Sequence, residues 1–194
     1  MKNITLIISL LFVQVLYSQE YPLNYEDRLN IPKGAYLKDM NGELTPYVGL
    51  WKGNWDGKII YIQLKKVKYA LGNLDDPHFM YRDRIVGERK IINANGSILI
   101  DRITNFDEQH SEFYGIGDKF SNPSQKYIAF YPKNMCGMNA NLDITFLNAA
   151  KTQISLHLIY NPKTLDESCP YYNSMMQGNE PPFNFPKDIV LIKQ

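Results

Sequence analysis

A tryptophan-containing strand followed at once by a tight turn constrains this chain more than any other feature. Residues 47–55 (YVGLWKGNW) are followed by Asp56-Gly57 and then by the apolar run 59–62 (IIYI). Asp-Gly favours the positive φ angles of a type I′ turn, whose twist matches the twist of a hairpin. The pattern therefore predicts two antiparallel strands, at 48–55 and 58–68, that begin a small barrel.

The alternation of apolar and polar residues continues along the chain. Ile60, Ile62 and Leu64 share one face of the second strand, and more polar side chains share the other. Asn95-Gly96 is a second hairpin signal. Further strands are predicted at 81–94, 97–102, 113–119, 126–131, 141–147, 153–160 and 188–192. Regularly spaced short strands predict an all-β fold, an up-and-down antiparallel barrel of about eight to ten strands, with an open sandwich as the alternative.

Two long segments lack this alternation. Residues 19–46 are rich in Tyr, Asn, Pro and Gly, and we expect them to form an N-terminal extension that leads into the barrel. Residues 161–187 carry repeated prolines, which rule out a helix, and many aromatic residues. Long connections are functional or packed over something, so we expect this covering loop to lie across one barrel mouth. Residues 105–112 are predicted to form a solvated loop.

The N-terminus has the layout of a secretory signal peptide. Lys2 precedes an almost continuous apolar run from Ile4 to Leu16, and the small residue Ser18 follows. The run is too short to span a membrane comfortably. We therefore expect residues 1–18 to be cleaved and the protein to be exported, either to the periplasm or out of the cell. Residues 47–194 then form a single barrel domain without a membrane span.

The charge of the chain excludes one class of partner. It has 21 basic and 20 acidic residues, and loss of Lys2 with the signal peptide leaves the two equal. A net charge near zero gives no long-range attraction to nucleic acid. The charge says nothing about the oligomeric state.

The chain has two cysteines, Cys136 and Cys169. An exported chain meets oxidising conditions, which favours a disulfide between them. Such a bond would close a loop of about 34 residues and stabilise the fold by roughly 3–4 kcal/mol. Two free, buried thiols are the alternative.

Groups that could carry chemistry occur without the spacing of a known motif. Residues 75–78 (DDPH) and 107–112 (DEQHSE) hold possible metal ligands, but neither has a recognised ligand pattern. No Gly-x-Ser-x-Gly elbow is present, and His157 alternates with the apolar residues of its strand, so it points outward. The Gly-x-Gly at 115–117 lacks the third glycine and the helix of a phosphate loop. We therefore predict no catalytic residue, metal or cofactor, and a protein that is not an enzyme.

Several short motifs resemble those of known families. Gly49-Leu50-Trp51 resembles the opening signature of the lipocalins and their calycin relatives, in which the Trp packs across the barrel floor. The wider layout resembles an uncharacterised family of exported Bacteroidota proteins, a domain of unknown function. That family shares a Tyr-Leu-x-Asp segment (36–39), a Gly-Glu in a middle strand (87–88) and a C-terminal Pro-x-x-Ile/Val-Val-Leu-x-Lys (186–193). The resemblance implies a lipocalin-like barrel with Trp51 at its floor, although the C-terminal helix of a typical lipocalin has no counterpart here.

Two functions follow from such a barrel. In the first, it binds a small apolar or amphipathic ligand. The candidate ligand-binding residues are Trp51, Trp55, Ile60, Ile62, Leu156, Tyr171, Tyr172 and Phe183. In the alternative, a solid-core barrel acts as a protein-interaction module at the cell envelope, with an envelope protein as its partner. The volume inside the barrel distinguishes them, and the large inward side chains favour a filled interior.

Overall fold

The computed structural model describes residues 19–27, 30–119 and 122–194, and the predicted signal peptide therefore lies outside the described residues. The chain forms two compact units. One comprises Met1–Met40, as far as these are described, with Tyr69–Asp83; the other comprises Asn41–Lys68 with Arg84–Gln194. No helix among the described residues is both long and apolar enough to cross a lipid bilayer.

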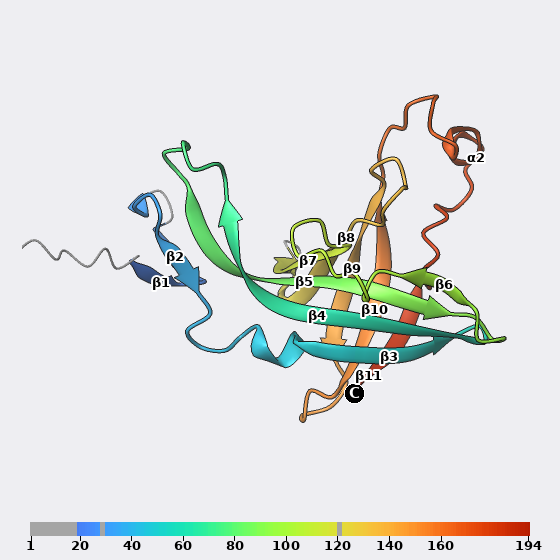
Figure 1. The fold of residues 1–194 in the computed structure, drawn as a ribbon, viewed down its shortest axis with the longest axis horizontal. Helices are drawn as coiled ribbons and strands as arrows, with labels where there is room; N and C mark the ends of the chain where they lie inside the picture. Colours follow the sequence, from blue (N-terminus) through green and yellow to red (C-terminus); the bar gives the residue numbers. More distant parts are fainter. Residues whose placement is uncertain (1–18, 28–29, 120–121) are drawn as a thin grey trace, which may run out of the picture. The chain divides into compact units, whose positions relative to one another are not determined.

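The larger unit contains a closed antiparallel barrel of 8 strands, which confirms the predicted fold class. Successive strands are neighbours around the wall, and the last strand lies beside the first (Figure 1). The barrel strands are β3 (Gly49–Trp55), β4 (Lys58–Leu71), β5 (Met80–Ile92), β7 (Phe113–Lys119), β8 (Asn122–Phe130), β9 (Asn139–Phe146), β10 (Gln153–Asn161) and β11 (Asp188–Lys193). A 3-10 helix, η2 (Thr45–Tyr47), precedes β3.

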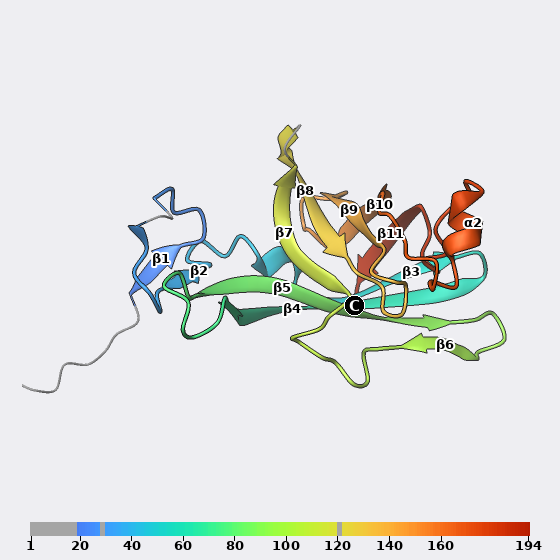
Figure 2. The same ribbon diagram turned by 90° about the horizontal axis from the view of Figure 1, so that it is seen from above.

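The predicted turns are present. Asp56 and Gly57 have φ angles of 46° and 75°, as a type I′ turn requires. Asn95-Gly96 joins β5 to β6 (Ile98–Asp101), which lies along the end of β5 outside the barrel wall (Figure 2). There the Gly96 N–H donates to the Asn93 carbonyl at 2.9 Å, and Gly96 has a φ of 82°. Both hairpin predictions are confirmed.

Short ladders close the barrel at both of its seams. β5 meets β7 through Val86↔Tyr114 and Gly87↔Phe113, and β11 meets β3 beside Trp51. A Cβ on Gly87 would lie 2.5 Å from Leu64 Cδ2 and 3.0 Å from a backbone oxygen of β4. Glycine at this position therefore allows β4, β5 and β7 to approach closely.

The smaller unit is built on short strands. β1 (Glu20–Pro22) pairs in parallel with β2 (Tyr36–Lys38), and β2 pairs in parallel with the start of β5. Ile31, Ala35 and Leu37 form its core. The Tyr36 hydroxyl donates to Asp83, and burial together with this carboxylate raises the pKa of Tyr36. The Tyr-Leu-x-Asp segment thus has a structural role, because its first side chain fixes β2 to β5.

Two sequence predictions about the loops were wrong. The 161–187 segment contains a single-turn helix, α2 (Tyr172–Met176), because five residues fit between Pro170 and Pro181 without placing proline in the helix. The 105–112 segment is not solvated throughout, since Ser111 and Glu112 are buried. Glu112 is buried because it pairs with an arginine from β5, described below.

Candidate functional site

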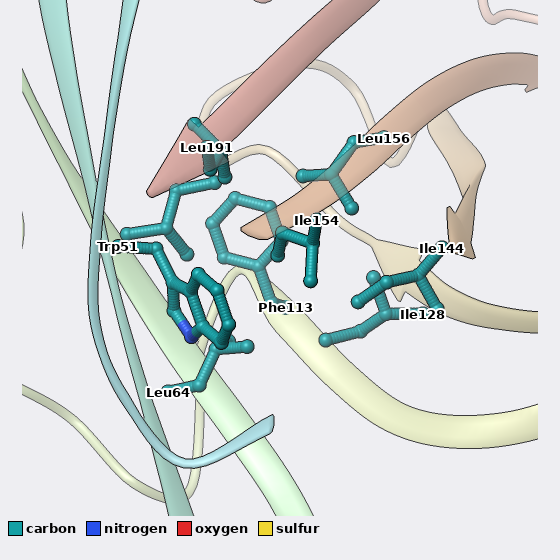
Figure 3. A pocket seen from close by; sticks show the side chains of 9 residues that line it. Trp51, Leu64, Phe113, Ile128, Ile144, Ile154, Leu156 and Leu191 are labelled. Atoms are coloured by element: carbon teal, nitrogen blue, oxygen red, sulfur yellow. The ribbon is translucent and has the colours of Figure 1, made fainter. Parts of the chain in front are cut away.

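The interior of the barrel is filled by side chains. A cavity of about 10 Å³ remains, about the volume that one water needs. Apolar side chains from facing strands converge on it (Figure 3). The lining residues are Trp51, Ile62, Leu64, Phe113, Ile128, Ile144, Ile154, Leu156 and Leu191.

The structure brings together only part of the predicted ligand-binding set. Trp51, Ile62 and Leu156 line the cavity, and Ile60 is fully buried without lining it. Trp55 is partly exposed, with the Lys58 ammonium 4.0 Å from its ring. The other predicted residues, Tyr171, Tyr172 and Phe183, belong to the covering loop and do not line the cavity.

Trp51 is fixed at one end of the interior. Its side chain is completely buried, and the indole Nε1–H donates to the Tyr47 carbonyl at 2.8 Å. The Lys193 ammonium lies 5.3 Å from the ring centroid, which is within cation–π range. The η2 turn and the end of β11 therefore hold the tryptophan that the sequence singled out.

An aromatic cluster underlies the last part of the covering loop. We call residues 181–186 (PPFNFP) the strap. Phe185 lies 5.1 Å from the ring of Phe130, which stacks on Phe113 at 4.9 Å. Phe183 contacts Phe130 and Tyr160, and both strap phenylalanines are buried. The strap is therefore packed against the barrel.

A buried ion pair fixes the strap. The Arg89 guanidinium, on β5, bonds to Glu112 with Nε at 2.8 Å from Oε2, and both side chains are almost fully buried. Its Nη1 also donates to the backbone carbonyls of Phe183 at 3.2 Å and Asn184 at 2.7 Å. Burial lowers the pKa of Arg89, and Glu112 opposes this shift by stabilising the charged form. One arginine thus joins β5, the approach to β7 and the strap.

A second buried carboxylate lies beside this pair. Glu88 has no exposed surface, and its Oε1 accepts a hydrogen bond from Lys133 Nζ at 2.9 Å. Lys133 belongs to the connection between β8 and β9, residues 131–138, which we call the tether loop. The Lys133 backbone N–H also donates to Glu112 Oε1 at 3.1 Å. Both carboxylates therefore hold the same loop.

The predicted disulfide is confirmed. Cys136 of the tether loop is bonded to Cys169 of the covering loop. The segment that follows, residues 170–180, contains α2 and projects between this bond and the strap; we call it the knob. Met176 at its centre is 71% exposed, and Tyr171 and Tyr172 are partly exposed. Both ends of the knob are thus anchored to the barrel.

Removal of the disulfide should be costly. Replacing Cys136 and Cys169 together with serine is expected to lower the free energy of unfolding by about 3–4 kcal/mol, because the bond constrains a long loop of the unfolded chain. Urea denaturation of the variant and the oxidised wild type measures the difference. Equal midpoints and slopes would contradict the expectation.

In the two loops with possible metal ligands, residues 75–78 and 107–112, aspartate side chains accept hydrogen bonds from backbone N–H groups of the same loop. Asp76 accepts from the His78 N–H at 2.8 Å, and Asp107 accepts from the N–H groups of Gln109 and His110. Within the described part of the chain, no group of three or more His, Cys, Asp or Glu side chains is placed to hold a metal ion. His157 points outward as predicted and pairs with Asp188.

Sequence reasoning missed the buried charges. Arg89 lies two residues from both Gly87 and Ile91, so it shares their face of β5. The alternation of faces along the strand could therefore have shown that this charged side chain points inward. The burial of Glu112 was not predictable in this way, because Glu112 lies in a run of polar residues just before a strand. Its burial follows from the position of Arg89 in the fold.

Comparisons with known proteins place the chain in a family but find no similar individual protein. Comparisons with curated proteins and with solved structures each find no match. The family of unknown function DUF6705 matches residues 1–194, and the chain therefore belongs to this family.

Proposed function

We propose that the protein is an exported, solid-core barrel that acts as a protein-interaction module at the cell envelope. The observation that carries this proposal is the volume of the interior. Ligand pockets measure about 300–1,000 Å³. The cavity of about 10 Å³ beside Trp51 admits nothing larger than a water molecule, so the geometry favours binding at the surface over binding inside the barrel.

The knob is the surface that best suits a partner. Its central residue Met176 is exposed, and aromatic side chains flank it. The disulfide at one end and the Arg89-bound strap at the other pre-organise it, which lowers the entropic cost of binding. Its one charged residue is Glu180, so the matching surface on the partner is an apolar recess with little charge.

Export is part of the same proposal. The predicted signal peptide at residues 1–18 supports it, and so does the disulfide, because such bonds persist in oxidising compartments.

Cross-linking in cells of the native host, followed by mass spectrometry, tests the proposal. We expect one envelope protein to be linked reproducibly to the wild type, and the link to be lost when Tyr172 and Met176 are both replaced with serine. Leu147→Ser is the matched control, because Leu147 is 48% exposed but lies outside the knob. A small molecule that co-purifies in one-to-one ratio, with no linked protein, would overturn the proposal.

A further inference from the structure

Glu88 is a buried carboxylate with incomplete hydrogen bonding. Its Oε2 has no hydrogen-bond partner among the described residues, and the side chain is completely buried. The charged groups that face it are Lys133 from the tether loop, Glu112 from the segment before β7 and Arg89 from its own strand. A buried carboxylate oxygen without a partner is costly when the group is ionised and much less so when it carries a proton.

The tether loop that covers Glu88 is held against its local preference. Cys136 has a φ angle of 52°, in the left-handed region that residues other than Gly, Asn and Asp adopt at a cost. The contacts from Lys133 to Glu88 and to Glu112 maintain this conformation. Cys136 is bonded to Cys169, which immediately precedes the knob, so a movement of the tether loop also moves the start of the knob.

We propose that Glu88 is a proton-operated latch: with its proton bound it holds the tether loop closed, and when it loses the proton the loop loosens together with the disulfide-linked end of the knob.

The direction of the effect follows from linkage. In the closed loop, burial raises the pKa of Glu88, and the attraction of Lys133 only partly offsets this rise. In an open loop, water reaches the carboxylate and returns its pKa to the ordinary range. The closed state therefore binds the proton more tightly. Protonation of Glu88 stabilises the closed state fully when the pH is below the ordinary pKa of a carboxyl group. This stabilisation is lost as the pH rises through the raised pKa of Glu88 in the closed state.

Hydrogen exchange of the wild-type protein measures the latch without a partner. We expect protection of residues 131–138, corrected for intrinsic exchange rates, to fall as the pH rises from about 4 to about 8, by up to about tenfold for each pKa unit of the shift. Residues 170–180 should follow the same profile. This response is independent of the interaction proposed for the knob, whereas a pH-dependent affinity for the partner rests on that interaction.

Variants separate a latch from a merely structural role. In Glu88→Gln the pH dependence should disappear, because the group no longer titrates. In Lys133→Met the loop loses its hydrogen bond to Glu88, so protection of residues 131–138 should be lower at every pH, and its fall should extend to higher pH because the opposing charge is lost. Asp101→Asn is the control: Lys90 holds the pKa of Asp101 at about 2, so Asp101 stays ionised from pH 4 to pH 8 and its replacement should not change the profile.

Two results would overturn the proposal. One is a pH profile of residues 131–138 that is the same in Glu88→Gln and in the wild type. The other is an NMR titration of the Glu88 carboxyl in the wild type with a midpoint in the ordinary range, a measurement that remains possible if Glu88→Gln does not fold.

Discussion

Replacing Glu112 with alanine is expected to lower the free energy of unfolding by about 3–5 kcal/mol, because it leaves the Arg89 guanidinium buried without its counter-ion. Both side chains are almost fully buried, so water cannot compensate for the lost carboxylate. The substitution also removes the acceptor of the Lys133 N–H, which destabilises the tether loop. Urea denaturation followed by circular dichroism measures the change.

A matched surface pair provides the control for this prediction. Glu108 pairs with Lys65 at 3.4 Å, and both side chains are about half exposed. Glu108→Ala should therefore cost at most about 1 kcal/mol. In addition, Arg89→Met should recover part of the stability that Glu112→Ala loses, since it removes the uncompensated charge. Similar losses in Glu108→Ala and Glu112→Ala would show that the buried pair does not hold the barrel and strap together.

Trp51→Ala is the second change with a large expected effect, a loss of about 3–5 kcal/mol. Trp51 has no exposed surface, and the cavity that it lines in the barrel interior measures only about 10 Å³. Its removal leaves a large cavity and deprives the Tyr47 carbonyl of the indole donor. Thermal unfolding, with a fit that includes the heat-capacity change, gives the size of the loss.

Trp55 is the natural comparison for Trp51. It lies four residues further along β3 but is partly exposed, and the Lys58 ammonium lies above its ring. Trp55→Ala should therefore cost clearly less than Trp51→Ala. If the two substitutions had equal effects, Trp51 would not be the floor of the core that we describe.

Local pattern predicted most of the fold. Asp56-Gly57 and Asn95-Gly96 placed two hairpins, and strict alternation in the later strands placed the sheet. The Cys136–Cys169 bond was predictable from the expected compartment. These features depend on residues close in sequence or on cysteine chemistry, so they are visible without coordinates.

Features that depend on tertiary packing were less predictable. Glu88 has the strand parity of the outer face and is nevertheless buried, because Lys133 and Glu112 come from distant segments to meet it. The helix α2 was not predicted because the repeated prolines drew attention away from residues 171–180, a proline-free stretch long enough for a five-residue helix. The size of the cavity depends on how side chains from facing strands interlock, which alternation along one strand does not determine.

The most direct test of the filled interior uses Trp51 as a probe, in a Trp55→Phe variant that leaves it the only tryptophan. Brominated fatty acids quench indole fluorescence on contact, and Trp51 lines the cavity. We predict no saturable quenching as such a fatty acid is titrated into the folded protein. Saturable quenching with one-to-one stoichiometry would show that the barrel opens to admit a ligand, and would contradict the solid core on which the proposed interaction role depends.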